Sequence, residues 1–381
     1  MNNANRRRKV LIIPLNWGLG HATRMTVVAR ILSEMGAEVT VAASGAARRV
    51  MECELPHLRF VPLSGFEMKY YRRLPAVLSI LCQLPLWFWS LYQDRRLFLH
   101  LLQRESFDLI ISDNHFGCHS KKHTSIIITH QIRILLPWYL RPFEPLVGYI
   151  NRRLINRFSE CWVPDVAHGD GLSGRLARGV PLGIPVQYAG PLSRLRPCQA
   201  SPKRWDVLLL LSGPEPMRSR FEHLLRQQLK TLPIKALLIR GTKGVVDQIR
   251  REEQHLHVAD FLTTPRLQEE LCAAQVVVCR SGYSTLMDLQ RCKIAAVVVA
   301  TPGQPEQEYL AFHLNQLGIC HAVRQSCLDL KKALAQAHRY HGWQALPDSD
   351  RWQNLLAEKL GVPNPTAATA PDVPLDQKTI G

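Results

Sequence analysis

Short, uninterrupted apolar runs recur along this chain, and each is followed by a segment long enough for a helix. In the first half these runs lie at 9–14, 37–43, 108–112 and 125–129, and a helix is expected at about 21–35. Strands that are apolar on both faces are typical of parallel sheets covered by helices on both sides. The sequence therefore predicts an α/β fold with parallel sheets.

The alternation of strands and helices stops once and then restarts. Residues 190–205 are rich in proline and basic residues, which indicates a linker. Beyond this segment, apolar runs follow again at 206–212, 234–240, 275–281 and 294–300. Two doubly wound domains joined by a linker are the simplest architecture that fits this pattern.

The length of the chain agrees with two domains, because 381 residues exceed the roughly 150 residues of one ordinary domain. The predicted bounds are 1–190 for the first domain, 191–204 for the linker and 205–342 for the second domain. The tail at 362–381 has no apolar periodicity and is predicted to be disordered.

The charge of the chain is strongly positive, with 48 Lys plus Arg against 31 Asp plus Glu and a formal net charge of +17. Such an excess is typical of proteins with an acidic partner, such as phosphate, nucleic acid or anionic lipid. The sequence contains no zinc-finger, RNP-like or KH-like pattern. We therefore expect phosphate or lipid and no nucleic acid.

The ten cysteines do not have the spacing of a metal site. Cys272 and Cys279 form a close pair, but their separation differs from that of a zinc knuckle. We expect all ten to be reduced, packed thiols in a cytoplasmic protein. The N-terminal segment has too few apolar residues for a signal peptide, which also favours a cytoplasmic location.

An uncharged segment of nineteen residues lies at 74–92, between basic residues at 69–73 and 94–96. Its length is near the ~20 residues that span a bilayer, but Pro75 and Pro85 weaken a spanning helix. We expect a surface helix or hairpin, so that 69–96 docks on anionic lipid at the inner face of the cytoplasmic membrane. An ordinary buried helix of the first domain is the alternative.

A glycine-rich turn follows the first apolar run and contains Gly18, Gly20 and His21. Open α/β folds bind ligands at such turns, and the start of the next helix offers backbone N–H groups to an anion. Thr23 stands where a dinucleotide motif has its third glycine, which disfavours a dinucleotide site. His21 is a candidate general base, with a capping or core histidine as the alternative.

Other polar residues follow the apolar runs at 108–112 and 125–129. Because the carboxyl ends of parallel strands meet at one edge of the sheet, these residues are candidates for the same pocket as His21. Asp113 is a candidate for orienting His21, and structural polar caps are the alternative. The candidates are Arg24, Asp113, His115, His130 and Gln131.

Three polar turns follow apolar runs in the second half of the chain. Arg280 adds charge for a diphosphate, and Asp288 lies where a carboxylate can accept both hydroxyls of a ribose. Carboxamides at the last turn suit sugar hydroxyls. Taken singly, each turn is also compatible with an ordinary loop. The residues are Ser212 and Gly213; Arg280, Ser281, Gly282, Thr285 and Asp288; and Gln304 and Gln307.

In this order along the chain, the turns resemble those of the two-domain GT-B glycosyltransferases. The likeness is closest to the branch that includes the peptidoglycan N-acetylglucosaminyltransferase and plant monogalactosyldiacylglycerol synthase. It spans about residues 9–340 and is stronger in the second domain. The resemblance implies two Rossmann-like domains facing a cleft, with a last helix within 343–361 that crosses back to the first domain.

The resemblance also implies a site. The second domain would hold a nucleotide-sugar, most often a UDP-sugar, and the reaction would need no cofactor and no metal. His21 and Asp113 would lie at the reacting centre. The acceptor would meet Gly18, Gly20, Arg24, His115, His130 and Gln131. The donor would meet Ser212, Gly213, Leu262, Arg280, Ser281, Gly282, Thr285, Asp288, Gln304 and Gln307.

Departures from the family pattern leave the donor sugar and the acceptor open. Asp288 stands where glutamate is usual, Glu308 where a second glutamine is usual, and Ala311 where asparagine is usual. The expected function is an inverting glycosyltransferase acting on a lipid, lipid-linked or cell-envelope acceptor. The alternatives are a nucleotide-sugar 2-epimerase on the same fold and a non-catalytic protein that binds nucleotide-sugar or a membrane surface.

Overall fold

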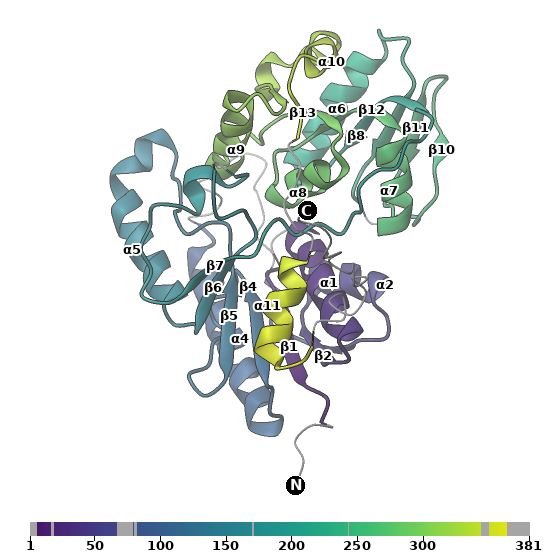
Figure 1. Cartoon of the computed structure of the whole chain (residues 1–381). Helices are drawn as coiled ribbons and strands as arrows, with labels where there is room; N and C mark the ends of the chain where they lie inside the picture. The colour runs from purple at the N-terminus through teal and green to yellow at the C-terminus, as the bar shows by residue number, and fades with distance from the viewer. Residues whose placement is uncertain are drawn as a thin grey trace, which may run out of the picture.

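Two sheets of seven strands each form the frame of the molecule, one above the other in Figure 1. The computed structural model describes residues 6–16, 19–66, 79, 82–169, 171–242, 244–343 and 350–363. Residues 69–78 of the expected lipid-docking segment, Gly18 and most of the C-terminal tail lie outside the described residues.

The first sheet is parallel throughout, in the order β3-β2-β1-β4-β5-β6-β7. Its central strands are buried on both faces, as their continuous apolar sequences predict. The strands are β1 (Lys9–Pro14), β2 (Glu38–Ala42), β3 (Arg59–Val61), β4 (Leu109–Asp113), β5 (Thr124–Ile128), β6 (Glu160–Val163) and β7 (Val186–Tyr188).

Helices cover this sheet. The first of them buries Ala22, Met25, Ala29 and Leu32, which recur at the three- and four-residue spacing of one helix face. The helices are α1 (Leu19–Glu34), α2 (Gly45–Glu54), α4 (Leu84–Arg104) and α5 (Glu144–Ile155), with short 3₁₀ helices η2 (Trp138–Phe143) and η3 (Gly174–Leu176).

The second sheet has the order β10-β11-β9-β8-β12-β13-β14, and only β10 is antiparallel to its neighbour. The strands are β8 (Trp205–Leu210), β9 (Ala236–Ile239), β10 (Arg250–Arg251), β11 (Leu256–Ala259), β12 (Ala274–Cys279), β13 (Ala295–Val298) and β14 (His321–Ala322). The helices are α6 (Met217–Leu229), α7 (Thr264–Cys272), α8 (Tyr283–Cys292), α9 (Pro305–Gln316), η4 (Gln325–Cys327) and α10 (Leu330–Ala337). The predicted pair of doubly wound domains is confirmed.

Each sheet has a point at which the strand order reverses, between β1 and β4 in the first sheet and between β8 and β12 in the second. Open α/β folds bind ligands beyond the carboxyl ends of the strands at this point. Asp113 ends β4, and the turn after β12 begins at Arg280. Both reversal points therefore place predicted site residues at the carboxyl edge of a sheet.

The last helix, α11 (Arg351–Leu360), lies against the first domain, beside β1 in Figure 1. The indole of Trp352 donates a hydrogen bond to the carbonyl of Gly190 (2.9 Å), and its ring meets that of Trp162 with centroids 5.8 Å apart. Lys359 pairs with Glu160 on β6. The chain thus passes from the first domain to the second and returns.

Two cysteines correct the prediction that all ten are thiols. Cys198 and Cys272 form a disulfide although they are 74 residues apart in sequence. The pair forms because the segment after β7 runs along α7 and brings Cys198 to the C-terminal end of that helix. The other eight cysteines are free, but the prediction of packed thiols holds only for the five that are buried, because Cys53, Cys82 and Cys327 are exposed.

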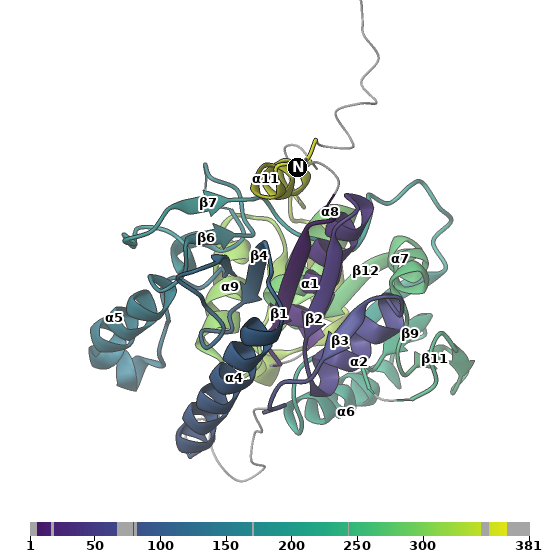
Figure 2. The same cartoon turned by 90° about the horizontal axis from the view of Figure 1, so that it is seen from below.

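Helix α4 begins inside the uncharged segment at 74–92 and presents much of its apolar surface to solvent. Its buried residues are Ser90, Asp94 and Phe98, whereas Phe88 and Trp89 are about 60% exposed. The alternative of an ordinary buried helix is therefore wrong for this part of the segment. Figure 2 shows α4 at the edge of the first domain, reaching away from the sheet. Within the described ranges, no helix combines the length and the hydropathy needed to cross a bilayer.

Candidate active site at the domain interface

His21 and Asp113 lie together at the reversal point of the first sheet. His21 is in the first turn of α1, directly after β1, and Asp113 is the last residue of β4. Nδ1 of His21 is 3.0 Å from Oδ2 of Asp113. Asp113 is fully buried, whereas the side chain of His21 is 18% exposed. Within the described part of the chain, Nε2 of His21 makes no hydrogen bond, so this nitrogen remains available to a ligand.

Arg24 lies one helical turn after His21 and completes this cluster. Its Nε donates to Oδ2 of Asp113 at 3.0 Å, and its Nη2 donates to Oδ1. The same Nη2 lies 2.9 Å from Nδ1 of His21. Burial opposes ionisation of Asp113, but the charges of Arg24 and His21 outweigh it and lower the pKa of that carboxyl. Asp113 is therefore a carboxylate that can hold a proton on Nδ1 of His21.

A second histidine connects the two domains. His130 follows β5, and its Nε2 lies 2.7 Å from Oε1 of Glu306 in the first turn of α9. Its ring stacks on Tyr283 with centroids 4.0 Å apart. Burial lowers the pKa of His130 more than Glu306 raises it, so the ring is neutral and donates to the carboxylate. The sequence reasoning missed Glu306, although Gln304 and Gln307 flank it.

The first turns of α1 and α8 touch across the domain interface. The hydroxyl of Ser284 donates to the carbonyl of Gly20 at 2.9 Å, and that of Tyr283 donates to the carbonyl of Pro164 at 2.9 Å. A Cβ at Gly20 would lie 2.9 Å from the Ser284 hydroxyl, so a larger residue would displace that hydroxyl. The N-terminus of α8 therefore lies beside the His21 turn.

The turns predicted to bind the donor lie at the reversal point of the second domain. Ser212 and Gly213 follow β8, and Gly213 has a φ of +98°, which favours glycine. Gly282 is the N-cap of α8, and Thr285 is in its first turn. The hydroxyl of Ser281 is fully buried and donates to the carbonyl of Gln307 at 2.8 Å. The start of α8 thus presents backbone N–H groups at this edge of the sheet, an arrangement that suits an anion.

Arg280 lies at the predicted turn after β12, but its side chain is buried within the second domain. Its guanidinium is 1% exposed and donates to the carbonyl of Ala300 at 3.0 Å and to Oε1 of Gln325 at 2.7 Å. It also lies over the ring of Phe221, 3.9 Å from the centroid. Burial lowers the pKa of Arg280 to about 10. Carbonyl oxygens, Gln325 and the ring therefore occupy this side chain, and a contact of Arg280 with a diphosphate stays a prediction.

Asp288 is held by residues of the segment before β8. Its Oδ1 accepts a hydrogen bond from the hydroxyl of Ser193 at 2.6 Å, and its Oδ2 lies 3.6 Å from Nε of Arg194. Burial raises the pKa of Asp288 although Arg194 and Ser193 oppose the shift. Arg194 also approaches Glu54 of the first domain at 3.9 Å. Sequence reasoning named Asp288 but neither of its partners.

The turn at 301–308 is braced by its own side chains. Oε1 of Gln307 accepts from the backbone N–H of Thr301 at 2.9 Å, and its Nε2 donates to Oε1 of Gln304 at 2.7 Å.

Leu262 directly follows Phe261 after β11, and its side chain is only 2% exposed. Its side chain is therefore packed in the core, so only its backbone could contact the nucleobase of a nucleotide.

Two of the predicted acceptor residues have structural roles. His115 is 5% exposed, and its Nε2 lies 3.1 Å from Oδ2 of Asp94, which ties the turn after β4 to α4. Burial opposes a charge on this ring, but Cys118 and Asp94 raise the pKa of His115 to about 10. The carbonyl of Gln131 accepts from Asn151 at 3.1 Å. Asp94 therefore holds Nε2 of His115, and the acceptor role of His115 stays a prediction.

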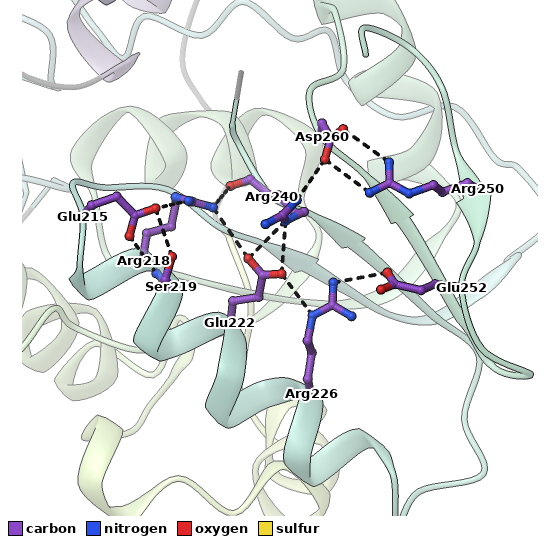
Figure 3. Close-up of polar contacts among 9 residues, drawn as sticks. All are labelled: Glu215, Arg218, Ser219, Glu222, Arg226, Arg240, Arg250, Glu252 and Asp260. Atoms are coloured by element: carbon purple, nitrogen blue, oxygen red, sulfur yellow. Dashed lines mark hydrogen bonds and ion pairs between the residues drawn. The ribbon is translucent and has the colours of Figure 1, made fainter. Parts of the chain in front are cut away.

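An ion-pair ladder crosses the second domain from α6 to the ends of β9 and β11 (Figure 3). At its centre Glu222 accepts from Arg226 at 3.0 Å and from Arg240 at 3.1 Å. Asp260 pairs with both Arg240 and Arg250. Because each arginine in the figure has a carboxylate partner, these cations are neutralised within the domain. The ladder therefore supplies no free arginine cluster for a phosphate.

Comparison with family models gives one match, in which residues 221–340 fit the glycosyltransferase family 28 C-terminal domain. Comparison with curated proteins finds no match.

Solved structures show the same two-domain arrangement. MurG of Acinetobacter baumannii is 13% identical with a TM-score of 0.55, over 94% of this chain and 100% of that one. UGT89C1 of Arabidopsis thaliana, complexed with UDP-L-rhamnose, is 13% identical with a TM-score of 0.55, over 93% and 95%. LpCGTa, in complex with UDP, is 14% identical with a TM-score of 0.58, over 94% and 100%. The protein has the GT-B fold.

Proposed function

We propose that this protein is an inverting glycosyltransferase that moves a sugar from a UDP-sugar to a hydroxyl group without a catalytic metal. The observation that carries the proposal is the His21–Asp113 pair, which lies beside the N-terminus of α8 across the domain interface. The match of residues 221–340 to a glycosyltransferase domain supports the same activity.

In the proposed reaction His21 is the general base. Its Nε2 takes the proton of the acceptor hydroxyl, and the acceptor oxygen attacks the anomeric carbon. The bond from this carbon to the diphosphate oxygen breaks, and the nucleoside diphosphate leaves with the electron pair. Asp113 keeps the other ring nitrogen protonated and stabilises the imidazolium. The N–H groups that begin α8 stabilise the negative charge of the leaving group.

The second domain is the proposed donor site. The turns after β8 and β12 would hold the diphosphate, the backbone of Leu262 the base and Asp288 the ribose. Gln304 and Gln307 would face a hexosyl or N-acetylhexosaminyl group. Two solved structures of the same fold support a uridine nucleotide, because LpCGTa is in complex with UDP and UGT89C1 with UDP-L-rhamnose.

Calorimetry with nucleotides tests the donor. Purified protein in EDTA is titrated with UDP, GDP, dTDP and CMP and with their common sugars. We expect saturable binding of the UDP class alone, together with a melting temperature that rises with ligand concentration. EDTA is expected to leave both binding and transfer unchanged. If no nucleotide bound, a non-catalytic protein would replace the proposal.

The carboxylates at the domain interface favour transfer over the alternative 2-epimerase. An epimerase on this fold needs acidic groups that are free to exchange protons with the sugar. Asp113 is paired with Arg24, and Glu306 is paired with His130. Incubation of UDP-N-acetylglucosamine without an acceptor is therefore expected to yield no epimer by NMR.

We further propose a lipid or lipid-linked acceptor and peripheral binding to an anionic membrane. Helix α4 presents Phe88, Trp89 and Tyr92 to solvent, each more than half exposed. A second exposed apolar face runs along η2 and α5, and includes Trp138 at 78% exposure. Beside α5 lies an open hollow of about 800 Å³, whose basic lining residues are Lys121, Arg152, Arg153 and Arg157. Apolar residues next to unpaired cations are typical of proteins that bind anionic lipid.

Sedimentation with anionic vesicles tests this surface. The double substitution Phe88→Ser and Trp89→Ser is expected to lower the bound fraction several-fold, because it removes apolar area that would enter the bilayer interface. Phe312→Ser is the matched control, since Phe312 is 60% exposed on α9 of the other domain. Equal sedimentation of the double variant and the control would remove α4 from the proposed membrane surface.

A further inference from the structure

Three cysteines from three segments meet at one place in the second domain. Cys198 belongs to the segment before β8, Cys272 ends α7 and Cys292 ends α8. Their sulfur atoms all lie within 4.8 Å of one another. Cys198 and Cys272 form the disulfide, and Cys292 is a buried thiol. The proposed transfer uses none of these side chains.

The disulfide fastens the interdomain segment 191–204 to α7 at the middle of a row of hydrogen bonds. Before it, the side chain of Gln268 accepts from the backbone N–H of Arg196 at 2.8 Å and donates to its carbonyl at 2.9 Å. After it, the ammonium of Lys203 donates to the carbonyl of Cys272 at 2.9 Å. These contacts are polar and partly exposed, so the covalent bond is the strongest attachment in the row.

The other cysteines indicate the conditions in which the disulfide exists. All eight remain thiols, and Cys53, Cys82 and Cys327 among them are exposed. Exposed free thiols are typical of a reducing compartment, where a disulfide is usually transient or redox-sensing. Burial, followed by the nearby Asp288, raises the pKa of the Cys292 thiol to about 12, so this group is not a nucleophile at neutral pH. Reduction must therefore come from outside the protein.

We propose that Cys198–Cys272 is a redox-active disulfide that a small dithiol reduces, releasing the segment 191–204 from α7. A thiolate of the dithiol attacks Sγ of Cys198, which is only half-buried, and Cys272 leaves and takes up a proton. The second thiolate of the dithiol then displaces Cys198, which is protonated in turn. The dithiol becomes a cyclic disulfide, so two electrons and two protons pass to the two cysteines.

Release of the segment would also break its contacts with Asp288. Ser193 and Arg194, which hold that carboxylate, lie four and five residues before Cys198. Any effect of reduction on donor binding rests on the proposed function, whereas the redox reaction itself does not. The experiment therefore reads the disulfide and the mobility of the segment and needs no substrate.

The test uses the full-length protein equilibrated in mixtures of oxidised and reduced dithiothreitol. Iodoacetamide labelling after unfolding is expected to give eight labels in the oxidised protein and ten in the reduced protein, with one cross-linked peptide joining Cys198 to Cys272. On reduction, hydrogen exchange in 191–204 is expected to rise at least ten-fold. The melting temperature is expected to fall by about 5–10 °C, because a 74-residue loop is no longer closed.

Two variants complete the experiment. Cys198→Ser is expected to show the exchange and the melting temperature of the reduced protein in every buffer. Cys292→Ser is the matched control and is expected to keep the response of the natural protein. Ten labels in every buffer, a cross-link through Cys292, or unchanged hydrogen exchange after reduction would each overturn the proposal. Stoichiometric zinc in the reduced protein, lost in Cys292→Ser, would also overturn it in favour of a three-thiolate metal site.

Discussion

Replacing His21 with alanine is expected to lower kcat for sugar transfer by about 10³-fold, the usual contribution of a general base. Nucleotide affinity should stay within about two-fold, because His21 lies in the first domain and the proposed donor turns lie in the second. Without the imidazole, the acceptor hydroxyl has no group to take its proton. Release of UDP measures kcat, and calorimetry measures the affinity.

The control for this variant is His255→Ala. His255 is exposed between β10 and β11, away from both reversal points. Its loss should leave transfer and nucleotide binding unchanged. If His21→Ala kept the kcat of the natural protein, another group would have to be the base. If it lost nucleotide binding as well, His21 would support the fold of the turn instead.

Replacing Asp113 with alanine is expected to destabilise the protein by about 3–5 kcal/mol, because it leaves the buried Arg24 guanidinium without its carboxylate. Arg24 is 2% exposed, so its guanidinium would remain buried after the loss of its partner. The double variant Asp113→Leu and Arg24→Met is the control, since it removes both charges and should recover most of the loss. Urea unfolding followed by circular dichroism measures both.

The pH dependence of unfolding gives a second readout for the same pair. The pKa of Asp113 is lowered from 3.8 in the folded protein, so its stabilisation is present above pH 3.8 and is lost as the pH falls through the lowered value. The natural protein should lose this increment only in acid, and the double variant should lack it. Equal stability of Asp113→Ala and the natural protein would show that the pair is not structural.

The sequence predicts the strands that are buried on both faces, because their sequences are uninterrupted apolar runs. β1 and β12 are buried along almost their whole length, and their sequences show it. β10 and β14 have two residues each, too few for any pattern, and their pairing depends on neighbouring strands. These two strands can be identified only from the structure, in which they pair with their neighbours.

The site divides in the same way. His21 follows one parallel strand and Asp113 ends another, so the sequence predicts that both lie at the same edge of the sheet. Their direct contact depends on the pairing of β1 with β4, which the structure shows. The His130–Glu306 pair joins two domains, and its partners are 176 residues apart. The position of the Arg280 side chain depends on its hydrogen bond to a carbonyl group after another strand, β13. The sequence identifies a charged side chain, whereas packing decides which group forms its hydrogen bonds and ion pairs.

The return of α11 has a consequence for the protein's modular make-up. Because Trp352 contacts Gly190, the segment that leaves the first domain and the helix that returns to it lie close together. The second domain is therefore an insertion in the topological sense, since the first is completed by sequence on both sides of it. A cassette from 205 to 342 could be exchanged between relatives without cutting the Trp162–Trp352 contact. Under the proposed function, in which the second domain binds the donor and the first the acceptor, such an exchange would recombine donor and acceptor preference as separate genetic units.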